Sequence, residues 1–297
     1  MAIPFIREFD ARYETEVRVS PLISRIVADN PGPFTFKGTG VYIVGGADVA
    51  VIDPGPDDRS HVDALKRALA GRRVTHILVT HTHADHSPAA QPLKEWCGAK
   101  TYAFGPHGSG RPDDGVRMEE GGDMQFVPDV RVKDGEIIRG NGFTFECVFT
   151  PGHTSNHMCY ALKEEHALFT GDHIMGWSTT VVTPPDGDMA QYMASVKKLM
   201  ARDDATLYPT HGAPVTDPKP FLAAYLAHRL DREKQILACI QDGVATIPQM
   251  VARMYADVDK RLHPAASRSV LAHLIQLEGE GRVANDGGRY RLKANSQ

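Results

Sequence analysis

The distribution of apolar and polar residues divides the chain into two parts. From residue 41, short apolar and β-branched runs end at Gly, Pro or polar residues, a pattern that predicts buried strands. The predicted strands are residues 41–44, 49–53, 74–80, 143–149, 158–162 and 167–170. Helical spacing of apolar residues predicts helices at 60–69, with Ser60 as the N-cap, and around 189–200. This first part therefore combines sheet and helix layers.

A Pro-containing stretch at residues 212–220 precedes a change in pattern, and we place the boundary within it, near Asp217. Longer helical patterns follow at residues 220–241, 247–255 and 265–280, and then a strand pair within 282–292. Three helices and a hairpin are typical of a winged helix. Apolar residues share one face of the third helix, which favours core packing: Val270, Leu271, Leu274 and Leu277. We predict two domains, residues 1–216 and 217–297.

The composition is that of an ordinary globular protein, with 42% hydrophobic and 24% charged residues. No apolar run reaches the roughly 18 residues needed to span a membrane, and charged residues begin at Arg7, so we expect a cytoplasmic protein.

The four cysteines lack CxxC spacing, which favours buried free thiols. The tail has 12 Lys/Arg against 9 Asp/Glu, an excess too small to indicate a nucleic-acid footprint.

The sequence THTHADHS, residues 80–87, concentrates four metal-ligating side chains directly after a predicted strand: His81, His83, Asp85 and His86. Imidazole nitrogens and carboxylate oxygens suit Zn²⁺, Mn²⁺ or Fe²⁺, and one tight loop can serve two neighbouring ions. Three further candidates lie next to Gly at predicted strand ends: His153 in TPGHTSNH, Asp172 in FTGDH and His211 in YPTHG.

These elements and their order resemble the metallo-beta-lactamase superfamily over residues 17–215. The resemblance implies an α+β fold, a four-layer αββα sandwich, with two bound divalent metal ions. It implies that His81, His83 and His153 hold the first metal, that Asp85, His86 and His211 hold the second, and that Asp172 bridges them. Zinc is the preferred metal, with iron and manganese as alternatives. Two dications sharing a water would supply a metal-bridging hydroxide as nucleophile, and Asp85 would act as the catalytic residue that orients it.

Four other positions are candidates for supporting the site or contacting substrate. Asp53 resembles the buried carboxylate that orients a ligand histidine in the superfamily, and a turn-forming Asp before Pro54 is the alternative. His157, which follows His153, is either a substrate contact or an ordinary histidine of a tight polar loop. Trp177 and Thr179 belong to a Pro/Gly-rich segment, residues 176–188, which is either a substrate lid or a passive surface loop.

Nearly the whole chain resembles the lactamase-beta-like family with a beta-lactamase-associated winged helix, whose relatives include a single-strand-specific endoribonuclease. The resemblance rests on HTSNHMCY, GDHIMG, the STT of residues 178–180, AYLAHRLDREKQIL, RMYADV and AHLIQLEGEGRV. Relatives commonly have Gly-Gly where this chain has Pro88, Ala89 and Ala90, a difference that we expect to reshape the mouth of the site.

The bridging Asp disfavours beta-lactam hydrolysis by comparison with the family. We therefore predict a metal-dependent hydrolase acting on an ester, thioester or lactone bond of a small molecule. The alternative is a single-strand-specific endoribonuclease, with single-stranded RNA as partner. A purely nucleic-acid-binding winged helix is a third hypothesis, which is disfavoured because residues 265–280 contain a single basic residue, Arg268. No membrane partner is expected.

Overall fold

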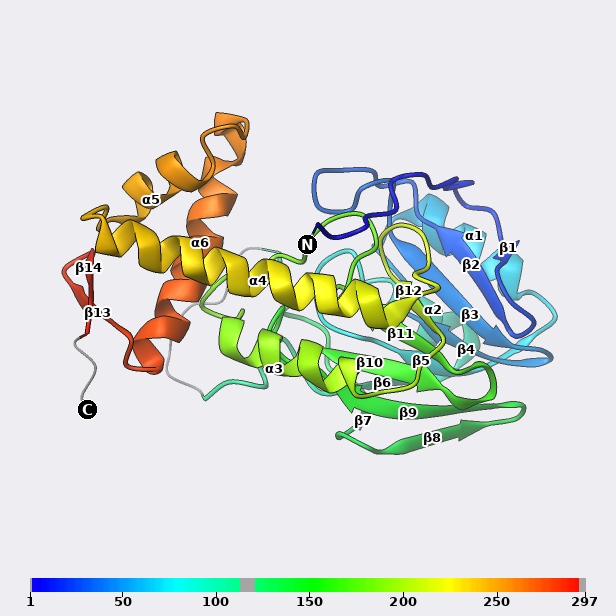
Figure 1. Cartoon of the computed structure of the whole chain (residues 1–297). Helices are drawn as coiled ribbons and strands as arrows, with labels where there is room; N and C mark the ends of the chain where they lie inside the picture. The colour runs from blue at the N-terminus through cyan, green and yellow to red at the C-terminus, as the bar shows by residue number, and fades with distance from the viewer. Residues whose placement is uncertain (1, 113–120, 294–297) are drawn as a thin grey trace.

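The computed structural model describes residues 2–112 and 121–293, in which two β-sheets are stacked face to face (Figure 1). The first sheet of the described chain has, in spatial order, β1 (Val17–Arg18), β2 (Ile23–Val27), β3 (Gly40–Gly45), β4 (Asp48–Ile52), β5 (Arg73–Leu78), β6 (Lys100–Ala103) and β7 (Val130–Arg131). Neighbours are antiparallel from β1 to β4 and parallel from β4 to β7.

The second sheet is smaller and mostly antiparallel. Its described strands are, in spatial order, β12 (Thr206–Pro209), β11 (Ala167–Gly171), β10 (Met158–Leu162), β9 (Phe143–Phe149) and β8 (Ile137–Gly140). β11 and β12 pair in parallel, whereas the other neighbours are antiparallel. The register pairs Tyr160 with Phe169 and with Cys147 across adjacent strands.

The main core fills the space between the two sheets. Alternation along β9 turns Phe143, Phe145 and Cys147 inward, where they are buried. Tyr42 and Tyr160 are fully buried with their hydroxyls satisfied, because Tyr42 Oη donates to Pro209 O at 2.6 Å and Tyr160 Oη donates to Val79 O at 2.9 Å. This packing fixes the two sheets relative to each other.

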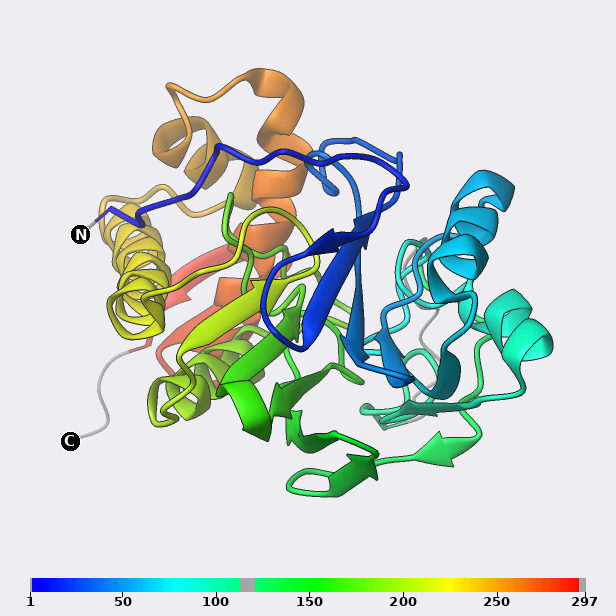
Figure 2. The same ribbon diagram turned by 90° about the vertical axis from the view of Figure 1, so that its right-hand side faces the viewer.

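Helices cover both outer faces and complete the predicted four layers (Figure 2). α1 (Arg59–Leu69) and α2 (Ala90–Cys97) lie on the first sheet, where Leu65 and Leu93 are buried. α3 (Met189–Met200) and the start of α4 (Pro218–Gln241) lie on the second sheet. A short 3₁₀ turn, η1 (Lys163–Glu165), joins β10 to β11.

The N-cap predicted for α1 was wrong by two residues. Asp58, not Ser60, has the extended backbone of an N-cap, and its carboxylate accepts hydrogen bonds from the backbone N–H groups of Ser60 and His61. A carboxylate accepts more strongly than a hydroxyl, and Ser60 Oγ itself lies within hydrogen-bonding distance of Asp58 Oδ1, at 2.5 Å. Ser60 therefore belongs to the first turn of the helix.

The C-terminal part has the predicted three helices and hairpin. After α4 come α5 (Ile247–Met254), the 3₁₀ turn η2 (Lys260–Leu262), α6 (His263–Gly279), β13 (Val283–Asp286) and β14 (Arg289–Leu292). Val270, Leu274 and Leu277 of α6 are buried in the core of this unit, and Leu271 is half-buried. The expected core face of the third helix is therefore largely confirmed.

α4 belongs to both cores. Phe221 and Tyr225 near its start pack in the layer between the second sheet and α3, whereas Ile236 and Ile240 near its end pack among α5, α6 and the hairpin. Its first residue, Pro218, lies next to the boundary predicted near residue 217, which stays a prediction.

The four cysteines are free thiols, as expected, and all except the half-buried Cys97 are buried. None of the helices in the described ranges is long and apolar enough to cross a membrane. The cytoplasmic location stays a prediction.

Candidate metal centre

The seven predicted ligands lie at one edge of the sandwich because each follows the carboxyl end of a strand. β5 leads into the loop that contains His81, His83, Asp85 and His86. β9, β11 and β12 run in the same direction, and the residues after them are His153, Asp172 and His211 respectively. Backbone contact joins the two sheets at this edge, where Met158 N donates to Thr80 O at 2.8 Å.

The ligand atoms form two groups. In the first, His81, His83, His153 and Asp172 each offer an atom, and these atoms lie within 4.8 Å of one another. His83 Nδ1 lies 3.0 Å from His81 Nε2 and 3.1 Å from His153 Nε2. Ligand atoms around a tetrahedral ion with bonds of about 2.0–2.1 Å lie roughly 3.3 Å apart, so this spacing fits a shared cation.

Asp85, His86 and His211 form the second group. Asp85 Oδ2 lies 3.2 Å from His211 Nε2 and 3.5 Å from His86 Nε2. Asp172 faces both groups, since its Oδ2 lies 3.8 Å from His153 Nε2 while its Oδ1 lies 3.3 Å from His211 Nε2 and 3.6 Å from His86 Nε2. One carboxylate thus has an oxygen directed to each group.

The donor set fits a pair of divalent cations. His86 Nε2 and Asp172 Oδ1 are buried and neither makes a hydrogen bond of good geometry. Buried polar atoms of this kind need a partner, and nitrogen and oxygen donors converging from several loops suit a dication. Burial, and the positive charge that His86 and His83 would carry, keep the pKa of His81 well below its usual value, so its ring stays neutral with a lone pair to donate.

In the second group, the carboxylates and the imidazoles shift each other's pKa values. Burial alone would raise the pKa of the Asp85 carboxyl, but the neighbouring His86 and His211 hold that pKa below its usual value. Burial opposes protonation of His211, and the Asp172 and Asp85 carboxylates nevertheless raise its pKa to about 10. The site thus favours added positive charge beside these two carboxylates.

Asp53 contacts His86 on the ring nitrogen that faces away from the other candidate ligands, and its orienting role stays a prediction. Asp53 Oδ2 lies 3.0 Å from His86 Nδ1, and the same carboxylate accepts hydrogen bonds from Thr80 N at 2.7 Å and from Thr210 Oγ1 at 3.1 Å. Asp53 is 1% exposed. A second-layer carboxylate in this position fixes the ring orientation and the tautomer of the histidine it contacts.

Several supporting contacts were not predicted from the sequence. His153 Nδ1 lies 2.6 Å from Val181 O, and His211 Nδ1 lies 3.2 Å from Gly38 O. Thr39 Oγ1 donates to Asp85 Oδ2 at 3.0 Å. Backbone carbonyls have no residue-type signature, so the first two contacts could not have been found from residue types, whereas Thr39 lies in a polar stretch before β3 without a recognisable motif.

The other three predicted residues lie beside the two groups and not within them. His157 is fully buried, its Nδ1 lies 2.9 Å from Thr150 Oγ1, and its ring centroid lies 5.2 Å from that of His81. Trp177 stacks on Phe36 with 4.7 Å between ring centroids and an interplanar angle of 9°. Thr179 is half-buried, and its carbonyl accepts a hydrogen bond from Ser178 Oγ.

The segment of residues 176–188 that contains Trp177 is anchored at several points. Beyond the contact of Val181 O with His153, Thr180 O accepts a hydrogen bond from the buried guanidinium of Arg229, and Asp186 Oδ2 accepts one from Ser155 N at 3.1 Å. The segment is therefore tied to the candidate ligand His153 and to α4.

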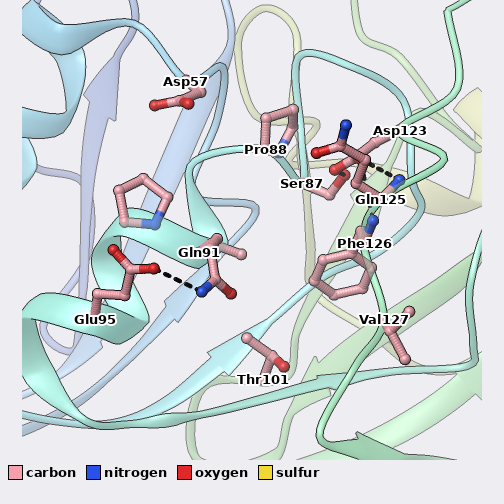
Figure 3. A pocket seen from close by; sticks show the side chains of 12 residues that line it. Asp57, Ser87, Pro88, Gln91, Glu95, Thr101, Asp123, Gln125, Phe126 and Val127 are labelled. Atoms are coloured by element: carbon pink, nitrogen blue, oxygen red, sulfur yellow. Dashed lines mark hydrogen bonds between the residues drawn. The ribbon is translucent and has the colours of Figure 1, made fainter.

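A hollow of about 610 Å³ lies beside Ser87 and Pro88, which directly follow the predicted ligand His86 (Figure 3). Its wall includes Ser87, which donates to Asp123 Oδ2 at 2.7 Å, and also Pro88 and Ala90. Ala89 and Ala90 are buried at the start of α2. None of the seven candidate ligands lines this hollow, so the effect expected of Pro88, Ala89 and Ala90 on the mouth of the site stays a prediction.

Comparison with known proteins identifies the family. The sequence model of the Metallo-beta-lactamase superfamily matches residues 35–211, and that of the Beta-lactamase associated winged helix domain matches residues 246–291. An atrochrysone carboxyl ACP thioesterase of Paecilomyces divaricatus is 34% identical over 226 residues, which are 75% of this chain and, at 66%, just under two thirds of that protein. A protein of the same name from Pseudocercospora fijiensis is 30% identical over 281 residues, 90% of this chain and 78% of the relative.

Among solved structures, a metallo-beta-lactamase family protein of Thermus thermophilus superposes with a TM-score of 0.75 at 24% identity, covering 93% of this chain and 100% of the other. This similarity shows the fold alone. The two family models, the sequence relatives and the superposed structure together cover both the β-sandwich and the C-terminal helices and hairpin. The chain therefore belongs to the metallo-beta-lactamase superfamily, as a hydrolase with a C-terminal winged helix.

Proposed function

We propose that this protein is a dinuclear metal-dependent thioesterase that hydrolyses the thioester of a small acyl group. The observation that carries the proposal is the position of Asp172 between two groups of ligand atoms, the arrangement that two neighbouring cations require. Relatives at 30% and 34% identity that are named thioesterases support the choice of thioester over ester or lactone.

We assign His81, His83 and His153 to one cation, Asp85, His86 and His211 to the other, and Asp172 to both. When bound, two dications lower the pKa of a water toward neutrality and polarise the substrate carbonyl. We propose zinc because mixed imidazole and carboxylate donors suit it and it needs no redox control, with iron and manganese as alternatives.

Asp85 is proposed to move the proton of the reaction. Its side chain is 25% exposed, so the carboxylate is partly open to the site, and Thr39 Oγ1 donates at 3.0 Å to Asp85 Oδ2, the same oxygen that faces His211 Nε2. As water attacks the carbonyl carbon, Asp85 accepts the water's proton; as the C–S bond breaks, that proton passes to the leaving thiolate. The products are a carboxylic acid and a thiol, so atoms and charge balance.

An aromatic pair lies on one side of the site. Trp177 and Phe36 form a stacked pair beside the loop that contains Thr39, and Gly212, next to His211, approaches the Trp177 ring so closely that a Cβ would lie 3.4 Å from it. Such an aromatic wall offers a flat apolar surface to an acyl group.

The proposal is tested by metal analysis of the purified protein, followed by hydrolysis assays with matched substrates. Acyl thioesters, the corresponding esters, lactones and a labelled single-stranded RNA are compared for the wild-type protein and for Asp172→Ala. We expect about two equivalents of metal and thioester hydrolysis that is lost in the variant.

Other outcomes have definite meanings. RNA cleavage that Asp172→Ala abolishes, without thioester turnover, would replace the proposal by the endoribonuclease alternative. A wild-type protein that binds no metal and hydrolyses nothing would overturn the metal centre itself.

A further inference from the structure

A groove of about 610 Å³ lies between the β-sandwich and the winged helix. One wall comes from α6, through Ala272, Ile275 and Gln276; the opposite wall comes from residues 184–191, which end the anchored segment and begin α3. α6 and α3 pack against each other, as Figure 1 also shows. The groove is thus built by both parts of the chain.

The groove lies close to the metal centre. Asp186, in its wall, accepts a hydrogen bond from Ser155 N, two residues after His153. Val181 O contacts His153 Nδ1 at 2.6 Å, and Pro184, the first groove residue of that segment, is three residues further along. Three residues of extended chain span at most about 10 Å, so this end of the groove lies within about that distance of Val181, whose carbonyl contacts His153.

The lining combines apolar side chains with buried acceptors. Ile275, 48% exposed, and Pro185 offer apolar contact surface. Asp186 Oδ1 and Gln276 Oε1 are buried without a hydrogen-bond partner, and these two residues are 1% and 8% exposed. Buried acceptors of this kind are satisfied when an N–H or O–H reaches them. The groove therefore suits a mainly apolar chain that carries N–H donors.

We propose that the groove binds the amide-bearing thiol arm of the thioester substrate, an arm of the pantetheine type. This inference rests on the proposed thioesterase function. The arm's amide N–H groups donate to Asp186 and Gln276, and its methyl and methylene groups pack on Pro185 and Ile275. The scissile carbonyl then lies toward His153, and the winged helix contributes to substrate selection.

The charge of the groove disfavours RNA as its occupant. The lining includes Asp186, Asp188 and Glu280 against Arg111 among the described residues. A phosphodiester chain would bring negative charge into this acidic surrounding, which costs free energy. A pantetheine arm is neutral along its length, and its phosphate, where present, is at the outer end.

The test compares two thioesters of the same acyl group, one on pantetheine and one on N-acetylcysteamine, which lacks most of the arm. Ile275→Trp and Ala190→Trp place a large ring in the groove from opposite walls, at positions that are exposed. Ala265→Trp, at an exposed position of α6 outside the groove, is the matched control. The readout is the ratio of kcat/KM for the two thioesters.

We expect the wild-type protein and Ala265→Trp to prefer the pantetheine thioester by about tenfold or more, and this preference to fall toward one in both groove variants. A wild-type protein without preference, or a preference that survives both substitutions, would overturn the groove assignment while leaving the thioesterase intact. Failure to hydrolyse either thioester would overturn the proposed function and this inference together. Acyl-CoA and acyl carrier protein, assayed in parallel, separate the two sources of the arm.

Discussion

Asp85 lies with its carboxylate beside His86 and His211 and is still partly open to solvent. An amide in this position retains an oxygen ligand but cannot accept a proton. We therefore expect Asp85→Asn with full metal content to lower kcat for a thioester by about 10²- to 10⁴-fold. Turnover is measured beside elemental analysis of the same sample. Asp57→Asn, which changes an exposed carboxylate, is the control. Normal activity of an Asp85→Asn protein with full metal content would reject the proton-transfer role.

Asp53 permits a separate prediction about metal affinity. Asp53→Asn keeps a side chain that favours the turn before Pro54 but weakens the acceptor that faces His86 Nδ1. We expect metal to bind about 10- to 100-fold more weakly, as measured by competition with a chelator. If Asp53 acted only in the turn, the affinity of this variant would match that of the wild type.

At the residue scale, the sequence identified the side chains that the structure brings together. Histidines and aspartates spaced as in residues 81–86 can be recognised in a sequence, because the capacity to bind a metal depends on the type of side chain. The contacts that orient them are less visible. Val181 and Gly38 act through carbonyl oxygens, which every residue has, so their role depends on the path of the backbone alone.

Among the elements, the anchored segment of residues 176–188 leads to a prediction about binding. Trp177 packs on Phe36 at the wall of the site, and removing its ring opens that wall. We expect Trp177→Ala to raise KM for an aromatic acyl thioester by about 10-fold or more. Trp96→Ala, on the outer face of α2 and 43% exposed, is the control. Equal KM values for Trp177→Ala and the wild type would argue against a substrate-contacting wall.

Elements with a regular spacing of apolar residues were predicted well. Elements in which polar residues or proline interrupt that spacing were missed. β9, β10 and α3 have the predicted bounds. β2 was missed because ISRIV contains Ser24 and Arg25, which are buried only through tertiary contacts; the Arg25 guanidinium lies over the Phe9 ring at 4.3 Å. α2 was missed because it contains Pro92 near its start and lacks a side-chain N-cap.

At the scale of the whole molecule, a buried histidine near the junction of the two parts predicts sensitivity to acid. Burial and the charge of Arg229 lower the pKa of His273 in α6 to about 3. The neutral ring contributes full stability above about pH 6.5; below this value the unfolded chain takes up a proton that the folded chain resists, so stability falls as the pH falls toward 3. The loss is at most roughly 1.4 kcal/mol per pH unit for one histidine.

This effect is measured by urea unfolding of the wild-type protein and His273→Leu at about pH 7.5 and about pH 5. We expect the variant to lose less stability between the two pH values than the wild type. The same loss in both proteins would show that another group governs the acid response.

α4 has a consequence for how the molecule holds together. Its first turns supply Phe221 and Tyr225 to one core, and its last turns supply Ile236 and Ile240 to the other. Neither core can lose its share of this helix without exposing apolar surface, so melting of one destabilises the other. We therefore expect the hydrolase body and the winged helix to unfold together, as one cooperative unit. A winged helix transplanted from a relative would have to bring its own half of α4.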